Sequence, residues 1–572
     1  MLAAGFTSCW FVDFEFQQLP GEIPSPICMV ACELFSGTKI ELFGDQLRAR
    51  THAPYPVDAS ALFVAYSATA ELSCHLALDW PLPEQVLDLY AEFRCQTNGV
   101  YLPLGSGIVG ASYYFGLSGI DAEEKEVMRD LAIRGGPYNR DERQALLAYC
   151  AGDVKALARL FGAMREYLDL PRALLRGRYI RALTSVELRG LPIDTANLAL
   201  LQRGWVDIRQ RFIETLDAPY GFYQDGSFVE KRFETWLNAQ GIRWPRLESG
   251  RLCLDDDTFK SMSAIHLSIA PVRELRRTLA TMREFDLTAG RDGRSRVSLK
   301  PWQSKTGRNQ PSAREFIFCF PKWMRGLLKP AAGRALSYVD WSQQEFGIAA
   351  ALSGDQNMMK AYASGDPYLA FAKQAGAVPL DGIKDEYEAA REQFKKCALA
   401  VQYCRGDKAL ALDMNQTSAH ARALLTRHRR TYRDFWIWND AVLDHAIYHR
   451  ILRCSFGWTV HLGKNFNERS VRNFLMQANG AEMMRIACIL AVEAGIEVCA
   501  TVHDAFVIEA DIDDIAQAEA LMQSCMAEAG RIVLNGFELR ADKKPILYPD
   551  RYQDDRGSHM WKRVMDLLAA EK

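Results

Sequence analysis

A short apolar segment near the start of the chain, WFVDFEF (Trp10–Phe16), contains two carboxylates. Its residue types predict a β-strand, and because successive side chains of a strand point to opposite faces, Asp13 and Glu15 share one face. Two carboxylates are costly to bury together unless cations compensate their charge, and hard divalent metals are the usual compensation. The alternative for an isolated Asp-x-Glu pair is an edge strand with two solvated acids, so further residues must decide between the two.

The first 165 residues alternate short apolar runs with helical stretches. Residues Glu142–Phe161 repeat apolar side chains at near-helical spacing, which predicts one long helix. The strand candidates are Trp10–Phe16, Ile27–Phe35, Leu62–Tyr66 and Val86–Leu89. Strands followed by helices predict an α/β or α+β domain, with a boundary near Pro171. From about Arg178 onward the chain is mostly helical in pattern and more strongly charged.

The composition describes a globular chain with an uneven charge distribution. At roughly 100–200 residues per domain, 572 residues suggest three or four domains, or two large ones. A hydrophobic share of 49% with 24% charged residues argues against disorder. The net charge of -2 excludes a protein that is basic all over, yet Val272–Arg334 holds 15 Lys/Arg against 5 Asp/Glu, a local +10. A neutral total can therefore hide a basic groove.

The fourteen cysteines form no CxxC pair, so neither a zinc finger nor a disulfide framework is indicated. Scattered cysteines in a long chain are typical of reduced core residues in an intracellular protein. The N-terminal residues lack a basic region of the signal-peptide kind, and no stretch reaches 18 apolar residues without charge. We therefore expect a soluble, cytoplasmic protein with no membrane partner.

Three more acidic or phenolic residues extend the first carboxylate pair. Glu71 follows the candidate strand Leu62–Tyr66 at the start of a helix, and Tyr149 and Asp153 are four residues apart on one helical face. The ordered set resembles the three motifs of the DEDDy-type 3′–5′ exonuclease family. The resemblance implies a ribonuclease-H-like fold over residues 1–170, with Asp13, Glu15, Glu71 and Asp153 holding two Mg²⁺ ions and Tyr149 orienting the attacking water.

The second of these motifs departs from the family, which has Asp where this chain has Glu71. Glu is one methylene longer, and Mg²⁺ demands near-octahedral geometry. Asp88, in VLDLY, is the alternative ligand.

Polar residues in three later segments suggest nucleotide chemistry. Asp340 ends a short apolar run in SYVDWSQQEF, and CATVHDAFVIE presents His503 and Asp504 at the turn of a strand hairpin. Between them, Arg391, Lys395, Leu399 and Tyr403 recur every four residues, so they form one stripe on a helix. One interpretation of that stripe is a solvated basic face. The alternative is a surface that binds a nucleoside triphosphate, on which Arg391 and Lys395 neutralise the phosphates while Leu399 and Tyr403 face the sugar and base.

In this order the three segments resemble motifs A, B and C of the family A, or DNA polymerase I-like, polymerases. Motif A is matched by Asp340, Ser342, Gln343 and Glu345, motif B by the stripe from Arg391 to Tyr403, and motif C by His503 and Asp504. The resemblance implies an α/β plus mainly helical fold, in which the exonuclease domain is followed by a right-hand polymerase domain over residues 171–572. Its thumb would span about 195–295, its palm about 296–350 and 455–572, and its fingers about 351–454.

The same resemblance assigns expected roles. Asp340 and Asp504 would bind two Mg²⁺ ions, with Mn²⁺ as a substitute. Arg391 and Lys395 would bind the triphosphate of a dNTP, beside a nucleotide pocket of Gln343, Glu345, Leu399 and Tyr403. Primer–template DNA would be contacted by Arg308 of KTGRNQP, by Arg469, Asn473 and Gln477, and by His503. Glu345 would exclude a 2′-hydroxyl, and the basic segment Val272–Arg334 would line the duplex.

Departures from the family leave several properties open. The family usually has Phe or Tyr at Leu399, Gly at Cys404 and Glu at Ala505.

The chain has no room for a 5′-nuclease domain, and this compact form is similar to bacteriophage replicative polymerases. The similarity implies a monomer that replicates phage DNA in the host cytoplasm, with accessory proteins. The alternatives are a 3′–5′ exonuclease with a non-polymerising DNA clamp and a non-catalytic nucleic-acid scaffold.

Overall fold

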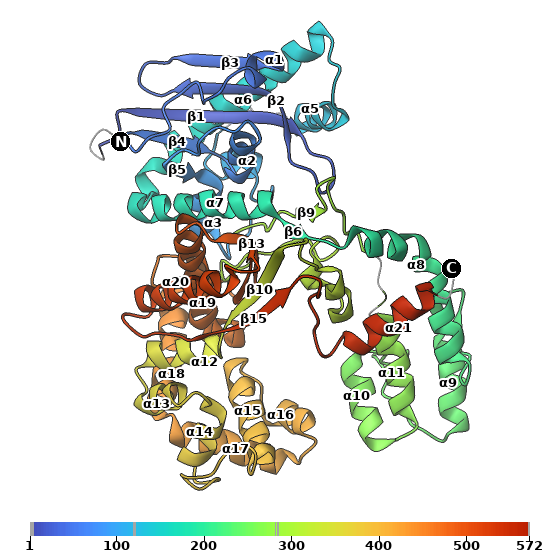
Figure 1. Cartoon of the computed structure of the whole chain (residues 1–572). Coiled ribbons are helices and arrows are strands. Elements are labelled where there is room, and N and C mark those ends of the chain that lie inside the picture. Colours follow the sequence, from blue (N-terminus) through green and yellow to red (C-terminus); the bar gives the residue numbers. More distant parts are fainter. Residues whose placement is uncertain (1–4, 118–121, 281, 283–284, 570–572) are drawn as a thin grey trace.

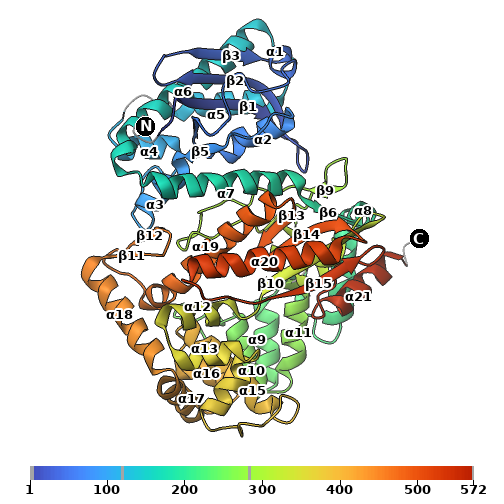
Figure 2. The ribbon, with the colours of Figure 1, turned by 60° about the vertical axis from the view of Figure 1, so that its left-hand side comes forward.

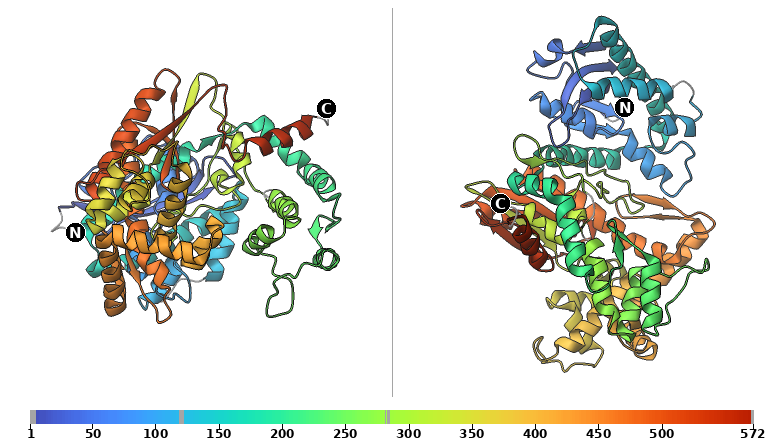
Figure 3. Two further views of the ribbon diagram at one scale, coloured as in Figure 1. Left: turned by 90° about the horizontal axis from the view of Figure 1, so that it is seen from below. Right: turned by 90° about the vertical axis from the view of Figure 1, so that its right-hand side faces the viewer.

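The computed structural model describes residues 5–117, 122–280, 282 and 285–569. An N-terminal domain is stacked on a larger part, and the long helix α7 (Leu170–Arg189) runs between them (Figures 1 and 2). The right panel of Figure 3 shows the same stacking from the side. One apolar core joins the two, because side chains of the N-terminal sheet, of α7 and of the central sheet of the larger part belong to a single buried cluster.

The N-terminal domain is built on a five-stranded sheet of order β3-β2-β1-β4-β5. Strands β1, β2 and β3 pair antiparallel, whereas β4 and β5 continue parallel to β1. The strands are β1 (Ser8–Gln17), β2 (Ser25–Glu33), β3 (Lys39–Phe43), β4 (Ala61–Ala65) and β5 (Gln85–Asp88). The helices are α1 (Asp45–Arg48), α2 (Thr69–Ala77), α3 (Leu89–Thr97), α4 (Ile108–Tyr114), α5 (Ala122–Arg134) and α6 (Arg140–Met164).

Strand β1 sends alternate side chains to two different cores. Trp10, Val12 and Phe14 pack in the cluster that contains α2 and α7, while Cys9 and Phe11 pack in the cluster that contains α6. The period-two rule therefore places the Asp13 side of the strand toward α6. All four expected strands and the long helix of this domain are confirmed, although β3 was not predicted.

The residue at the expected boundary, Pro171, lies in a helix that spans the junction of the two parts. Pro171 lies in the first turn of α7, where a missing N–H costs no intrahelical hydrogen bond. Asp169 caps this helix by accepting from the backbone N–H of Arg172. The connection to the larger part is thus a helix that packs on both parts.

The larger part is centred on a four-stranded antiparallel sheet of order β13-β14-β10-β15. Helix α20 covers this sheet, α19 packs on α20, and α12 follows β10 directly. The elements are β10 (Arg334–Trp341), α12 (Gln344–Ser353), α19 (Glu468–Glu493), β13 (Glu497–Val502), β14 (Ala505–Asp511), α20 (Ile515–Val533) and β15 (Ala541–Leu547).

Two helical arms extend from the same side of this sheet (Figure 1), and Figure 3 (left) shows one of them set apart from the rest. The range expected to form the thumb contains α8 (Thr195–Asp217), α9 (Glu230–Ala239), α10 (Asp256–Ile265) and α11 (Ile269–Ala280). The range expected to form the fingers contains α13 (Gln356–Ala363), α14 (Pro367–Gln374), α15 (Glu388–Gln402), α16 (Asp407–Met414), α17 (Ser418–Thr431) and α18 (Arg433–His449). The last helix, α21 (Ser558–Ala569), packs against α8.

None of the helices within the described ranges is both long and apolar enough to cross a membrane. Most of the cysteines are buried, and Cys319 is exposed.

Candidate active sites

The central sheet brings together the two carboxylates predicted from motifs A and C. Asp340 lies near the end of β10, in register with Ala505 of β14. The turn between β13 and β14 holds His503 and Asp504, and the backbone carbonyl of Asp504 accepts a hydrogen bond from the N–H of Trp341 at 3.2 Å. Antiparallel pairing of β10 with β14 thus places both residues at one edge of the sheet.

The charge state of Asp340 reflects a crowded acidic site. Partial burial, followed by the negative charges of Asp504 and Asp542, raises its pKa to about 8. Burial also raises the pKa of Asp504, against the opposing effect of the Arg308 guanidinium. Oδ1 of Asp340 is out of contact with solvent and has no hydrogen-bond partner in the described part of the chain. A divalent cation would satisfy this oxygen and relieve the repulsion, so the residues fit the predicted metal.

Asp542 is an acidic neighbour that the sequence motifs did not reveal. It lies on β15 in register with Asp340, and its Oδ2 accepts a hydrogen bond from Ser342 Oγ at 2.6 Å. No motif spacing marks this residue, because strand pairing alone brings it to the site.

Glu345, in the first turn of α12, faces a cation and a phenol. Its Oε1 lies 3.8 Å from Nη2 of Arg308. Burial raises the pKa of Glu345, while Arg308 and a hydrogen bond from Tyr403 oppose that rise. Gln343 precedes the helix with a left-handed backbone (φ 49°), and its buried Oε1 has no partner among the residues described. The structure therefore brings Arg308, Glu345, Tyr403 and Asp504 into one neighbourhood.

The expected stripe of motif B lies on α15. Arg391, Lys395 and Leu399 are half-buried along one face, and Tyr403 caps the C-terminus of the helix and is 48% exposed. The opposite face, with Phe394, Cys397 and Val401, is buried. The stripe is thus a partly covered surface instead of a fully solvated basic face.

Both cations of this stripe are paired within the protein. Nε of Arg391 lies 2.5 Å from Oδ2 of Asp366, and Nζ of Lys395 lies 3.4 Å from Oε2 of Glu392. A triphosphate would have to compete with these carboxylates. Asp366 is a second residue that the sequence did not reveal.

The expected DNA-binding residues of the palm occupy two places. Arg469, Asn473 and Gln477 follow one face of α19 at intervals of four; Arg469 is exposed and Asn473 is 8% exposed. His503 is exposed at the β13–β14 turn, with a left-handed backbone.

The basic segment Val272–Arg334 is not a continuous basic lining. Eight of its arginines form ion pairs in the described part of the protein: Arg273 with Asp256, Arg291 with Glu22, Arg294 with Glu509, Arg296 with Asp292, Arg308 with Glu345, Arg314 with Asp286, Arg325 with Asp554 and Arg334 with Asp511. Two of these acids, Asp286 and Asp292, belong to the segment itself, so acids elsewhere in the fold offset only part of the local +10, and the lining of the duplex stays a prediction.

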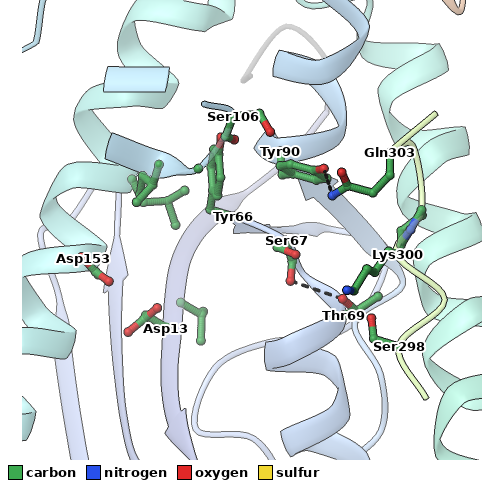
Figure 4. A pocket seen from close by; sticks show the side chains of 15 residues that line it. Asp13, Tyr66, Ser67, Thr69, Tyr90, Ser106, Asp153, Ser298, Lys300 and Gln303 are labelled. Atoms are coloured by element: carbon green, nitrogen blue, oxygen red, sulfur yellow. Dashed lines mark hydrogen bonds between the residues drawn. The ribbon is translucent and has the colours of Figure 1, made fainter. Parts of the chain in front are cut away.

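Two of the N-terminal carboxylates, Asp13 and Asp153, line a cavity of about 450 Å³ (Figure 4). Asp13 from β1 and Asp153 from α6 lie on one side, and Tyr66 and Tyr90 form the upper wall. Tyr149 precedes Asp153 by one turn of α6, and burial followed by the charges of Asp153 and Glu15 raises its pKa. The structure thus gathers residues of all three exonuclease-like motifs near one cavity.

Glu71, at the start of α2, is 5% exposed. Burial, and then the charge of Asp13, raises its pKa well above the usual range, with smaller contributions from Asp88 and Glu15. Its Oε2 has no hydrogen-bond partner within the described ranges. An orphaned carboxylate oxygen among other acids fits a cation, although no three His, Cys, Asp or Glu side chains in the described chain form a ready-made metal centre.

Asp88, the alternative ligand, has a structural role. Its carboxylate accepts hydrogen bonds from the backbone N–H groups of Ser67, Ala68 and Tyr90 at 2.9, 3.2 and 2.9 Å, and it caps α3. Burial nevertheless raises its pKa to about 6. With its oxygens engaged by three amides, Asp88 joins the end of β4 to α3, so Glu71 is the better candidate ligand.

Comparison with known proteins relates the chain to DNA polymerases. Residues 318–540 match the family model described as DNA polymerase family A. The chain is 23% identical over 435 residues to DNA polymerase I of Aquifex aeolicus, covering 68% of this chain and 73% of that protein. It is 22% identical over 420 residues to DNA polymerase I of Chloroflexus aurantiacus, covering 67% of this chain but only 44% of that protein.

A solved structure shares the fold over nearly the whole chain. It is the POL domain of Pol1 from M. smegmatis in complex with DNA primer-template and dNTP, with a TM-score of 0.70 and 17% identity. The likeness covers 95% of this chain and 96% of that one, so it includes the N-terminal domain.

Proposed function

We propose that this chain, whose residues 318–540 match the model of DNA polymerase family A, extends a primer along a DNA template and also removes nucleotides from the 3′ end. The observation that carries the polymerase activity is the pair Asp340 and Asp504, held together by β10 and β14 with a raised pKa and an orphaned carboxylate oxygen. The pair would hold Mg²⁺, or Mn²⁺, which when bound supplies Lewis-acid stabilisation of phosphoryl transfer.

The protein's own part in extension is positioning and charge. Arg391 and Lys395 would exchange their carboxylate partners, Asp366 and Glu392, for the phosphates of a dNTP. Glu345 would lie under the sugar and exclude a 2′-hydroxyl. Arg308 and Gln477 would donate to minor-groove acceptors, which every base pair presents, so the contact tests pair shape without reading sequence.

Removal of 3′-terminal nucleotides would take place in the N-terminal cavity. Asp13, Glu15, Glu71 and Asp153 would hold divalent cations, and the phenol of Tyr149 would orient the attacking water. The raised pKa and the orphaned Oε2 of Glu71 support this assignment. A mixed sheet covered by helices, with the acids at β1, α2 and α6, is the arrangement expected for a ribonuclease-H-like proofreading domain.

The proposed organisation is an exonuclease domain over 1–170 and a polymerase domain over 171–572. The helices of the ranges 195–295 and 351–454, which form two separate arms beside the palm sheet, support the thumb and fingers assignments. Replication of phage DNA in a host cytoplasm, by a monomer assisted by accessory proteins, completes the proposal.

Single substitutions separate the two activities. Asp340→Ala and Asp504→Ala should each abolish Mg²⁺-dependent dNTP incorporation on a primed template while the degradation of a mismatched 3′ end continues. Asp13→Ala should do the reverse. Extension that persists in both palm variants would refute the polymerase site, and unchanged degradation in the Asp13 variant would refute the exonuclease site.

A further inference from the structure

The N-terminal cavity has a wall that comes from outside the N-terminal domain. Ser298, Lys300, Pro301 and Gln303, all from the palm range, line it together with Asp13 and Asp153. Figure 4 shows Lys300 and Gln303 on a separate segment, on the far side of the cavity from the two aspartates. The cavity is therefore built across the junction of the two parts.

One hydrogen bond joins this wall to the aromatic side of the cavity. Nε2 of Gln303 donates to the hydroxyl of Tyr90 at 2.6 Å. Tyr90 is 8% exposed, and its ring lies edge-on to Tyr66 with 5.8 Å between centroids. The Tyr66 hydroxyl in turn donates to the carbonyl of Ser106 at 2.5 Å. Gln303 thus holds one end of a chain of contacts that runs along the cavity wall.

The segment that carries Gln303 is fixed in place by its backbone. Arg94 of α3 donates from Nε to the carbonyl of Trp302 and from Nη2 to the carbonyl of Gln303, both at 3.2 Å. Asn98 Nδ2 donates to the carbonyl of Lys305 at 2.7 Å. Lys300 and Trp302 have left-handed backbones (φ 47° and 57°), a conformation that persists in non-glycine residues only when the surroundings impose it.

We propose that Gln303 is a positioning residue for 3′-end removal: it fixes the Tyr90 hydroxyl in the cavity wall, so that the N-terminal site is complete only when the polymerase part is docked on it. The inference rests on the proposed exonuclease function. It deepens that function by assigning a residue outside residues 1–170 to the site. Tyr90 and Gln303 come from two parts of the chain, and neither belongs to the carboxylate motifs.

The test uses the full chain with Gln303→Ala, Tyr90→Phe and the double variant. Each single substitution removes the same hydrogen bond, so KM for degradation of a single-stranded oligonucleotide should rise about three- to tenfold, with kcat little changed. The double variant should be no worse than the more affected single variant, because both residues act through one contact. Gln240→Ala, an exposed glutamine of the thumb range, is the matched control.

Primer extension is measured in parallel because Arg308, an expected DNA contact of the polymerase site, lies five residues after Gln303 on the same segment. An unchanged extension rate shows that the substitution acts locally. An unchanged KM in Gln303→Ala, or additive losses in the double variant, would overturn the inference.

Binding separates failure of this inference from failure of the proposed function. If the unsubstituted chain degrades no 3′ end, the exonuclease proposal fails, and the affinity of the Asp13→Ala protein for a short single-stranded oligonucleotide becomes the readout. Addition of Gln303→Ala should weaken that binding, whereas addition of the control substitution Gln240→Ala should not. Equal affinities with and without Gln303→Ala would exclude the positioning role.

Discussion

Nζ of Lys260 lies 2.6 Å from Oδ1 of Asp413, and this ion pair joins the thumb range to the fingers range. Lys260 is on α10 and Asp413 on α16, at the ends of the two arms that point away from the palm sheet (Figure 1). Arg405 also contacts Asp413, with 2.5 Å between Nη1 and Oδ2. Burial opposes, and both cations favour, a lowered pKa of Asp413, so its carboxylate is charged and bridges the two arms.

Breaking this pair should speed both the entry and the escape of primer–template DNA. A partly exposed ion pair contributes about 0.2–1 kcal/mol, so Lys260→Ala and Asp413→Ala should each raise the association and dissociation rates about 1.5- to fivefold. Stopped-flow measurements with labelled primer–template test this, with the exposed Lys231→Ala on α9 as control. If Lys260→Ala speeds dissociation alone and Asp413→Ala has no effect, Lys260 binds a DNA phosphate instead.

The pKa of Asp340 predicts how magnesium dependence varies with pH. Mg²⁺ binds the carboxylate after it loses its proton, so the apparent affinity should rise with pH until it passes the metal-free pKa of about 8. Asp542→Asn removes a negative neighbour and should lower that pKa, moving the midpoint of Mg²⁺-dependent extension down by roughly half a pH unit. Asn still accepts the hydrogen bond from Ser342 Oγ.

Mg²⁺ titrations of primer extension over a pH series measure this shift, and Asp550→Asn, an exposed acid beyond β15, is the control. A midpoint that stays in place would contradict the charge effect. A loss of Mg²⁺ affinity at every pH would identify Asp542 as a ligand.

Local periodicity explains why much of the fold was predictable. Strand β1 and helix α6 each show their period within one stretch of sequence, and the structure confirms both. Strand β3, Lys39–Phe43, was missed because its five residues, KIELF, are short and mostly solvent-facing. Pro171 suggested a boundary because a proline usually interrupts helices, but in the first turn of α7 it is compatible with one.

The non-local part of the sites could not be predicted in the same way. Asp542 reaches Asp340 only through the pairing of β15 with β10, and Asp366 reaches Arg391 only because α14 packs on α15. The charge count of Val272–Arg334 could not reveal which of its cations are paired, since partners such as Glu509 and Asp554 lie far away in sequence. Strand pairing and ion-pair choice are decided by tertiary structure.

A buried ion pair supports the junction between the N-terminal domain and α7. Nε and Nη2 of Arg176 lie 2.5 and 2.7 Å from the two carboxylate oxygens of Glu92, and the two side chains are 8% and 4% exposed. Glu92→Gln leaves the guanidinium buried without its counter-charge and should destabilise the fold by about 3–5 kcal/mol. Urea unfolding followed by tryptophan fluorescence measures the loss.

The control for this prediction is an exposed ion pair that joins the same helix, α7, to the end of α19. Arg178 and Glu493 are 46% and 42% exposed, so Glu493→Gln should cost no more than about 1 kcal/mol. Equal decreases in the free energy of unfolding in the two variants would show that burial does not increase the contribution of the Arg176–Glu92 pair to stability.

The pairing of Arg391 with Asp366 predicts a variant that binds dNTP more tightly. Asp366 accepts from the N–H groups of Tyr368 and Leu369 at the start of α14, and Asn is an equally good cap, so Asp366→Asn should preserve the helix. The substitution removes the negative charge 2.5 Å from Nε of Arg391 and leaves the guanidinium available to a triphosphate. KM for dNTP should therefore fall about two- to fivefold in steady-state primer extension, the size expected for one partly exposed ion pair.

The exposed Asp434→Asn on α18 serves as the control and should leave KM unchanged. A higher KM in Asp366→Asn would instead mean that Asp366 holds Arg391 in the orientation that binds the phosphates, so that the pair is an assembled part of the nucleotide site and not a competitor for it.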